Sequence, residues 1–324
     1  MNRDEFYMAR ALELARHGEL DASPNPMVGA VIVGPDGKIA GEGWHRKCGE
    51  AHAEVNAVNA VADPELLAQS TIYVTLEPCA HYGKTPPCAK LLADKRIPRV
   101  VVGSEDPFAK VCGKGIAMLR EAGAEVTVGV LGEECRKLNR KFFTAHTLHR
   151  PYITLKWAMS RNGYIDGNIS DPLNHVAVHR LRAMNDAILV GSGTWLADSP
   201  SLSTRHFAGK SPKRAILDRR RRLTDLPDDV IRLSDYKSLS EAMQILYGEY
   251  GIISLLAEGG REVLQSFIDE GVYDEIRIEV SDNDIDGAVK APRLPEGITL
   301  ETVTSIGTHN ILTYTCLLYT SPSP

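Results

Sequence analysis

The stretch from His52 to Cys88 constrains the fold more than any other part of the chain. It opens with a His-x-Glu pair, His52 and Glu54, and it carries Cys79 soon after a strand-like run at 71–76. One imidazole and two thiolates supply three zinc ligands and leave a fourth tetrahedral position open, which is typical of a catalytic zinc site. Glu54 is a poor further ligand at this spacing, but it is well placed to move protons for a zinc-bound water.

Apolar periodicity puts these residues at the ends of predicted elements. A helix predicted at 51–61 has His52 and Glu54 in its first turn, where the partial positive charge of the helix N-terminus favours a hydroxide ion. The strand at 71–76 delivers Cys79 just beyond its C-terminal end, which is where α/β sheets build their sites. Strands that alternate with helices predict a mostly parallel sheet covered on both faces, and the second half of the chain repeats the alternation. Further strands are predicted at 28–33, 38–44, 99–103, 126–130, 152–156, 187–190, 215–217, 252–257 and 273–280, and further helices at 4–17, 89–94, 113–122, 133–149, 176–184, 239–247 and 262–268.

Length, charge and cysteine content limit the classes of protein to which the chain can belong. At 324 residues the chain suits two domains of ordinary size. A net charge of −5 gives no general reason to expect a nucleic-acid or membrane partner, and no apolar run is long enough to predict a transmembrane span. The first residues form an acidic amphipathic segment and not a secretion signal, so a cytoplasmic location with reduced thiols is expected. The other cysteines are expected to be small buried or partly buried residues: Cys48, Cys112, Cys135 and Cys316.

The order of the motif is that of the zinc deaminases, in which His-x-Glu precedes Pro-Cys-x-x-Cys. Here eight residues rather than two separate Cys79 from Cys88. One alternative is a structural zinc site, for which His81 or Cys48 could supply a fourth ligand, in a non-enzymatic domain of an assembly. Another is a nucleic-acid or free-nucleoside deaminase, against which the acidic balance and the long loop between the cysteines argue.

The insert itself is informative. Residues 78–88, with the sequence PCAHYGKTPPC, resemble the bifunctional deaminase–reductase family of riboflavin biosynthesis. The resemblance covers most of the chain. It implies a cytidine-deaminase-like three-layer α/β/α domain followed by a dihydrofolate-reductase-like α/β domain. Other segments agree with the family at 7–11, 24–29, 43–45, 52–57, 197–202 and 258–260.

The resemblance implies two successive steps. Residues 1–146 would form a deaminase, with one Zn2+ per domain, that hydrolyses the 2-amino group of 2,5-diamino-6-ribosylamino-4(3H)-pyrimidinone 5′-phosphate. Residues 151–316 would use NADPH to reduce the ribosyl group of 5-amino-6-(5-phosphoribosylamino)uracil to ribityl. Residues 317–324 continue no pattern and are expected to be a frayed or artefactual tail. The expected partners are these small molecules and further copies of the chain, in a dimer or tetramer, with no nucleic acid and no membrane.

For the deaminase, the residues and the resemblance agree on the chemistry. Zinc held by His52, Cys79 and Cys88 would activate a water, and Glu54 would carry its protons to the ring and to the leaving ammonia. The resemblance assigns four further residues to substrate binding: Asn25, His45, His81 and Lys84. Without the resemblance, a structural role is open for each of them. Asn25 could cap a turn, His45 could be a hydrogen-bonded surface residue, His81 could pack within its loop, and Lys84 could be solvated.

For the reductase, the sequence alone says less. Two glycine-containing turns, at 191–194 and 258–260, follow predicted strands, and the second opens a helix whose N-terminus could attract a pyrophosphate. Arg219 follows a strand end and is expected to bind the 2′-phosphate of NADPH, the alternative being a solvated turn. Substrate contacts are implied at Arg182, Leu202, Arg205 and Glu258, with the two arginines suited to the ribose phosphate. Cofactor contacts are implied at Met159, Thr194, Asp198, Arg219, Gly260, Arg261, Glu262, Val263, Leu264, Gln265 and Ser266.

Two segments of this half depart from the family pattern. The usual Ser-Leu-Asp-Gly element is Ser-Arg-Asn-Gly at 160–163, and the expected Gly-Glu-Ser-x-Trp-Ile segment is Gly-Asn-Ile-Ser-Asp at 167–171. These changes leave a second hypothesis open, namely an active deaminase that carries a weakened or inactive reductase-like domain.

Overall fold

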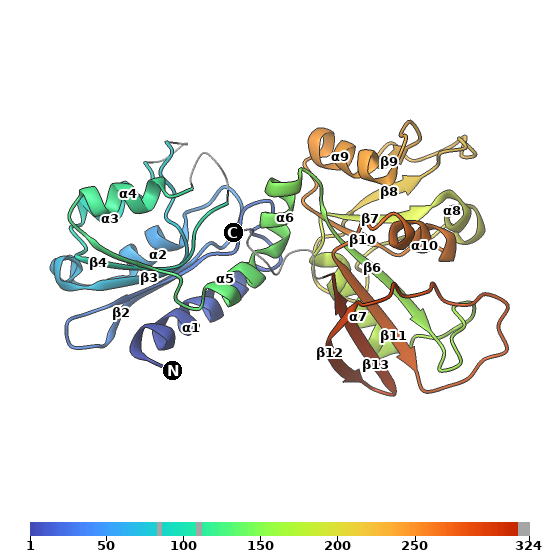
Figure 1. Cartoon of the computed structure of the whole chain (residues 1–324), viewed down its shortest axis with the longest axis horizontal. Coiled ribbons are helices and arrows are strands. Elements are labelled where there is room, and N and C mark those ends of the chain that lie inside the picture. The colour runs from blue at the N-terminus through green and yellow to red at the C-terminus, as the bar shows by residue number, and fades with distance from the viewer. Residues whose placement is uncertain (83–85, 108–111, 317–324) are drawn as a thin grey trace. The chain divides into compact units, whose positions relative to one another are not determined.

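The computed structural model describes residues 1–82, 86–107 and 112–316. The chain divides into two compact units, the first from Met1 to Leu148 and the second beginning at His149 (Figure 1). None of the described helices is long and apolar enough to cross a membrane.

The first unit is built on a mixed sheet. In the described part of the unit, five strands lie in the order β2-β1-β3-β4-β5, with β1 antiparallel to both of its neighbours and β3, β4 and β5 parallel. The prediction of a mostly parallel sheet is therefore wrong here, because the tight turn at 34–38 returns the chain beside itself and only later crossovers pass through helices. The strands are β1 (Gly29–Val33), β2 (Ile39–Trp44), β3 (Thr71–Leu76), β4 (Arg99–Ser104) and β5 (Glu125–Val128).

Helices cover both faces of this sheet. One face packs on α1 and α5 through side chains that include Met8, Val31 and Tyr73, and the other on α2, α3 and α4 through side chains that include Ile32 and Leu92 (Figure 1). The three-layer α/β/α arrangement expected of the first domain is thus confirmed. The helical elements are α1 (Arg3–Ala15), η1 (Arg16–Gly18), α2 (Ala53–Ala60), η2 (Pro64–Gln69), α3 (Cys88–Asp94), α4 (Lys114–Glu121), α5 (Gly132–Leu138) and α6 (Arg140–Leu148).

Strand β2 and helix α2 approach each other at backbone distance. A Cβ atom on Gly43 would overlap the carbonyl oxygen of Ala53 and the amide nitrogen of Ala57, and a Cβ on Gly41 would overlap the carbonyl oxygen of Ala57. Only glycine fits at such a contact. The two glycines therefore fix how closely α2 lies against the sheet.

Two of the cysteines expected to be buried are exposed. Cys48 and Cys112 lie exposed in loops, whereas Cys135 is a buried residue of α5 and Cys316 is half-buried. The expectation was wrong for the first two because it rested on residue type alone, and a cysteine in a loop has no core to enter.

The second unit has a larger and mainly parallel sheet. Over the described residues, eight strands lie in the order β12-β13-β11-β6-β10-β7-β8-β9, and only the pairs that β13 makes are antiparallel. The strands are β6 (Tyr152–Met159), β7 (Ala187–Gly191), β8 (Lys213–Leu217), β9 (Val230–Leu233), β10 (Ser254–Ala257), β11 (Glu275–Ser281), β12 (Thr299–Ile306) and β13 (His309–Thr315).

The two faces of β11 differ in chemistry. Ile276 and Ile278 enter the main apolar core, which includes residues of α9 and α10, while Glu275 and Glu279 point to the other face and are buried as well. Arg277 lies between these two carboxylates on the same face and interacts with both, and Tyr152 donates to Glu275, so this face of β11 is charged while the other is apolar. The helices of this unit are α7 (Pro172–Ala183), α8 (Ser192–Asp198), α9 (Leu239–Tyr250) and α10 (Arg261–Asp269).

Candidate active sites

The three predicted zinc ligands come together in the first unit. His52 is the N-cap of α2 and not a member of its first turn, Cys79 follows β3, and Cys88 is the first residue of α3. His52 Nδ1 lies 3.7 Å from Cys79 Sγ and 3.3 Å from Cys88 Sγ. These three donor atoms all lie within 4.8 Å of one another, and they form the cluster of possible metal ligands found among the described residues.

The geometry of the three donors fits a zinc ion. Zinc bound at about 2.3 Å from sulfur and about 2.1 Å from nitrogen would separate those atoms by roughly 3.6 Å in a tetrahedron. The two observed sulfur–nitrogen distances, 3.7 and 3.3 Å, lie on either side of that value. Two thiolates and an imidazole are also a donor set that zinc prefers.

The two thiols share a proton. A hydrogen bond from Cys88 lowers the pKa of Cys79 to about 4, and the same contact raises the pKa of Cys88. The backbone N–H of Cys88 also donates to Cys79 Sγ at 3.2 Å. One thiolate is therefore already stabilised, and binding of a metal ion would release the proton that remains.

Glu54 lies in the first turn of α2, two residues after the ligand His52. Its side chain is only 3% exposed, and this burial raises its pKa to about 7. A carboxyl group of this kind both accepts and releases protons near neutral pH. A bound dication would lower that pKa, because a nearby positive charge favours the carboxylate.

A pocket surrounds these groups. Its walls include Asn25, His45 and His81, as expected from sequence, together with His52 and Glu54. The predicted substrate residue Lys84 lies outside the described residues. The pocket is further lined by Pro26, Val28, Leu76, Glu77, Cys79, Asp106, Phe142 and His146.

His45 is engaged on both sides of its ring. Nδ1 lies 3.2 Å from the carbonyl oxygen of Ala51, which can only accept, so Nδ1 carries the proton. The amide of Asn25 then donates to Nε2 at 3.1 Å. Burial lowers the pKa of His45, which keeps the ring neutral. Both ring nitrogens are thus used to hold Asn25 and the 45–51 loop.

Glu77 is a functional residue that the sequence did not reveal. Its buried carboxylate accepts hydrogen bonds from the backbone N–H groups of Asp106, Gly113, Gly115 and Ile116, at 2.9–3.3 Å. The carboxylate therefore clamps the N-terminus of α4 to the segment that carries Cys79. The sequence did offer one signal for Glu77, namely a charged residue directly after the apolar strand β3.

Two adjoining pockets lie in the second unit. One contains three predicted cofactor residues, Thr194, Asp198 and Gly260, and the N–H of Gly260 donates to Thr194 Oγ1 at 3.1 Å. The other contains all four predicted substrate residues, Arg182, Leu202, Arg205 and Glu258. The structure thus separates the two predicted sets in space. Four residues line both pockets and are called the shared wall below: Lys156, Ser170, His175 and Glu258.

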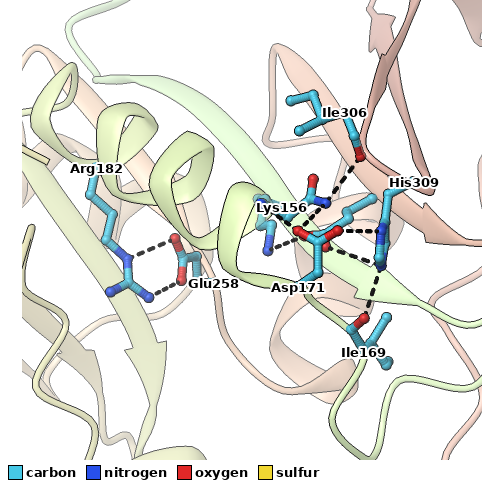
Figure 2. A network of polar contacts seen from close by, with 9 residues as sticks. Lys156, Ile169, Asp171, Arg182, Glu258, Ile306 and His309 are labelled. Carbon is cyan, nitrogen blue, oxygen red and sulfur yellow. Dashed lines mark hydrogen bonds and ion pairs between the residues drawn. The ribbon is translucent and has the colours of Figure 1, made fainter. Parts of the chain in front are cut away.

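Arg182 is already paired with a carboxylate. Its guanidinium forms a bidentate pair with Glu258, at 3.1 and 2.7 Å (Figure 2). It also donates to the carbonyl oxygen of Ser203. Arg182 lines the substrate pocket, and the phosphate role expected of it stays a prediction. Arg205 is exposed, and its guanidinium donates to the hydroxyl of Ser201 at 2.9 Å.

Lys156 was missed by sequence reasoning, which saw it only as the end of a strand. Its ammonium lies 3.5 Å from the buried carboxylate of Glu279, and its side chain is 10% exposed. Beside it, burial lowers the pKa of His179 to about 4, and its Nδ1 accepts from the N–H of His206. A lysine in a strand carries no motif, so only the pockets identify it.

Several predicted cofactor residues do not line either pocket. Met159 packs on the apolar core, Leu264 is fully buried in it, and Arg219 lies over the ring of Tyr236 at 5.8 Å. Gln265 accepts from the N–H of Arg293. Leu264 points into the core because α10 must bury its apolar stripe. The remaining expected contacts, which the pockets also lack, are Arg261, Glu262, Val263 and Ser266.

The segment 167–171, which departs from the family pattern, is part of the site. Residues 167–170 line the pocket that holds Thr194. Asp171 caps α7 by accepting from the N–H of Asn174 at 2.8 Å, and the carbonyl oxygen of Ile169 lies 2.9 Å from His309 Nε2 (Figure 2). The altered residues are therefore built into the structure.

Comparisons with known proteins cover both units. Residues 1–104 match the cytidine and deoxycytidylate deaminase zinc-binding region, and residues 151–314 match the RibD C-terminal domain. The riboflavin biosynthesis protein RibD of Bacillus amyloliquefaciens is 39% identical over 332 residues, covering 91% of this chain and 88% of that protein. The structure of RibD from Acinetobacter baumannii superposes with a TM-score of 0.88 at 33% identity, covering 97% of this chain and 98% of the other. The structure of a diaminohydroxyphosphoribosylaminopyrimidine deaminase/5-amino-6-(5-phosphoribosylamino)uracil reductase from Thermotoga maritima gives a TM-score of 0.87 at 32% identity, with the same coverage.

Proposed function

The chain belongs to the RibD family of riboflavin biosynthesis proteins, and from that membership we propose which of its residues carry each activity. It is a bifunctional enzyme with a deaminase domain followed by a reductase domain, and the predicted fold class is confirmed. Its cofactors are zinc and NADPH. The hypothesis of a weakened reductase-like domain is not favoured, because the RibD C-terminal domain matches the second unit along almost its full length.

The deaminase assignment rests on one observation: His52, Cys79 and Cys88 present three donor atoms in a pocket that also contains Glu54. Zinc, when bound there, supplies a Lewis acid that makes a water molecule nucleophilic at neutral pH. The substrate is 2,5-diamino-6-ribosylamino-4(3H)-pyrimidinone 5′-phosphate.

Glu54 moves the protons of this step. As the carbon gains oxygen and loses its exocyclic nitrogen, one proton of water reaches a ring nitrogen and stays there. The second proton, from the newly added hydroxyl, reaches the amine, which leaves as ammonia. Glu54 is the buried carboxyl group at this position, and one group can play each part in turn. Asn25, held by His45, and His81 bind the pyrimidine, and Lys84 meets the phosphate.

The reductase assignment rests on two adjoining pockets that meet at the shared wall. One is lined by the predicted cofactor residues Thr194, Asp198 and Gly260, and the other by the predicted substrate residues. NADPH, when bound, supplies a hydride. Thr194, Asp198 and the N-terminus of α10 at Gly260 hold its pyrophosphate side, with Arg219 at the 2′-phosphate. Arg205 and Leu202 hold the phosphoribosyl substrate, and Arg182 positions Glu258.

Lys156 is the proton donor of the reduction. When C1′ of the ribose gains hydrogen, its bond to the ring oxygen O4′ breaks, and O4′ takes up a proton to become the ribityl hydroxyl. An ammonium group on the wall between the cofactor and substrate pockets can reach that oxygen.

We also propose that the enzyme acts in the cytoplasm as a homo-oligomer, a dimer or tetramer. The thiolate ligands support a reducing compartment, since disulfide formation between them would destroy the zinc site. Light scattering of the purified chain measures the assembly, and a monomer at working concentration would contradict this part.

The central experiment incubates the zinc-loaded protein with the diamino pyrimidinone phosphate, with and without NADPH, and identifies products by mass. We expect the deaminated ribosyl product alone without NADPH and the ribityl product with it. Accumulation of the ribosyl product in the presence of NADPH would contradict the reductase assignment, and unchanged substrate would contradict the deaminase assignment.

A further inference from the structure

We infer that Glu279 is a positioning residue for the reductase, which together with His309 and Asp171 holds the ammonium of Lys156 at the shared wall. The inference rests on the proposed function, because it concerns the proton donor of the reduction. The observations behind it come from β6, β11 and β13 and from the segment 167–171.

Glu279 is a buried carboxylate with few partners. Its side chain is 1% exposed, and among the described residues neither carboxylate oxygen has a hydrogen-bond donor. Lys156 Nζ lies 3.5 Å from its Oε2, and His309 Nε2 lies 3.8 Å from its Oε1. Arg277, two residues away on the same face of β11, also interacts with it electrostatically. Because a charge removed from water must be compensated by an opposite charge, Glu279 restricts where the ammonium can lie.

The sheet sets the direction of this tether. Strands β6 and β11 are parallel neighbours, with Lys156 opposite Arg277 and Ala158 opposite Glu279. Side chains two residues apart share a face of the sheet, so Glu279 lies diagonally across from Lys156 on the same face. Lys156 reaches both reductase pockets from that face. The carboxylate therefore anchors the ammonium from the sheet side, and the substrate approaches from the pocket side.

His309 extends the network to the pocket wall. Its Nε2 donates to the carbonyl oxygen of Ile169 at 2.9 Å, and its Nδ1 lies 3.4 Å from the carboxylate of Asp171 (Figure 2). Asp171 in turn caps α7, and residues 167–170 line the cofactor pocket. His309 thus links Glu279, the carboxylate that holds Lys156, to the segment 167–171. The altered residues of this segment make the contacts to His309 in place of the family pattern.

A purely structural role explains this arrangement less well. Buried ion pairs seldom stabilise a fold more than apolar residues of the same volume would. The opposite face of β11 shows that the strand accommodates isoleucines where only packing is required. Charged residues at this one place, beside a lysine that borders two pockets, fit a requirement for a fixed ammonium.

The test compares Glu279→Gln with the intact chain. We expect the reductase kcat to fall by about 10- to 100-fold, because small displacements of a reacting group have effects of this size. The Kd for NADPH should change by less than twofold, and the deuterium isotope effect with deuterated NADPH should grow as the chemical step slows. Deamination by the same molecules should be unchanged, which would confine the effect to the second unit, while NADPH binding reports that this unit is folded.

A second readout needs no activity. Acetic anhydride labels lysine only as the free amine, and mass spectrometry measures the labelling of Lys156 in cofactor-free protein. Removal of the Glu279 charge should raise this labelling about tenfold, because an opposite charge favours the ammonium. The exposed Lys38 serves as the reference. The matched control is Asp229→Asn, which breaks an ion pair with Arg214 in the same unit but lines neither pocket, and it should change neither readout.

The outcomes are separable. A Glu279→Gln chain that keeps its reductase kcat and its Lys156 labelling within twofold of wild type overturns the inference, as does a simultaneous loss of NADPH binding and thermal stability. If this variant fails to fold, Glu279→Asp keeps the charge on a shorter side chain and should show a smaller loss of kcat with NADPH binding intact. A wild-type chain that deaminates but never oxidises NADPH would instead overturn the reductase assignment, and this is visible before any variant is made.

Discussion

The zinc ligands and Glu54 come from one stretch of the chain, His52 to Cys88, whereas the reductase pockets draw on strands and helices spread from Lys156 to Gly260. In the first site, a helix start and a strand end present the reacting groups directly. In the second, groups far apart in sequence meet only after the sheet has formed, and a lysine with no motif around it lies at the centre.

The difference teaches how each site depends on the rest of its domain. The zinc site is stabilised by the metal–ligand bonds and by a local clamp, Glu77, so most distant changes should spare it. The reductase site depends on pairs such as Arg182–Glu258 and Lys156–Glu279, in which each partner sits on a different element. Loss of one partner leaves the other buried without compensation.

The largest expected effect is on the zinc site. Cys88→Ser should remove a thiolate ligand, and deamination should fall by more than the roughly 10⁴-fold that acid–base catalysis alone contributes, because no activated water remains. NADPH oxidation with the deaminated substrate should be unchanged. Metal analysis and both activity assays measure this. Cys112→Ser, which changes an exposed cysteine, is the control. Retained zinc and activity in Cys88→Ser would break the ligand assignment.

Glu54→Gln should separate the metal from the proton transfer. The amide keeps the size of the side chain but cannot carry protons, so kcat for deamination should fall roughly 10²- to 10⁴-fold while bound zinc stays at one per chain. Full activity in this variant would exclude Glu54 as the proton carrier. Loss of zinc would instead show that Glu54 supports the ligands.

The pair between α7 and the Glu258 turn should be the most sensitive point of the reductase outside Lys156. Arg182→Ala leaves the carboxylate of Glu258, which is 11% exposed, without its cation. We expect kcat/KM of the reductase to fall about 10²-fold, because an unpaired buried charge is costly, and deamination to be unaffected. Arg161→Ala breaks a pair that is mostly exposed and should cost almost nothing. Equal effects of the two variants would remove the distinction between buried and exposed pairs.

A smaller effect is expected at the cofactor. Of the four arginines at 219–222, Arg221 pairs with Asp235 and Arg222 donates to Ser192. Arg219→Gln should reduce the preference for NADPH over NADH about tenfold, the effect of one phosphate contact. Arg220→Gln is the neighbouring control. An unchanged preference in Arg219→Gln would mean that the arginine belongs to a solvated turn.

The smallest effect tests the structural-zinc alternative. Cys48 lies in the loop before His52 and is exposed. Cys48→Ser should leave zinc content and deamination unchanged and shift the free energy of unfolding by less than about 0.5 kcal/mol, as for most surface changes. Loss of zinc would identify Cys48 as a fourth ligand. The zinc site would then also depend on a residue outside the stretch from His52 to Cys88.

The fold class and the zinc site could be predicted from the sequence because their signals are local. Periodicity located most strands and helices, and His52, Cys79 and Cys88 fall at element ends, where side chains converge. The Pro35-Asp36-Gly37 turn predicts the antiparallel hairpin of β1 and β2. The antiparallel pairing of β1 with β3 could not be predicted, since the direction of strands far apart in sequence depends on which of them meet after collapse.

The pairs inside the reductase site could not be predicted, for a related reason. The sequence around Arg182 does not show that Glu258 will lie 2.7 Å away. Lys156 and Glu279 become partners only through the register of two parallel strands. The cofactor contacts expected on α10 formed a continuous run from Gly260 to Ser266. Leu264, within that run, lies in the apolar core.

Gly41 and Gly43 hold α2 against β2 at backbone distance, and α2 carries Glu54 and begins at His52. A scan of random substitutions should therefore record these two glycines among the least tolerant positions of the first domain, although neither side of the contact includes a ligand. Directed evolution toward new pyrimidines would do best to leave this strand unchanged. Diversity is better introduced around Asn25 and His81, where the pocket wall is made of loops.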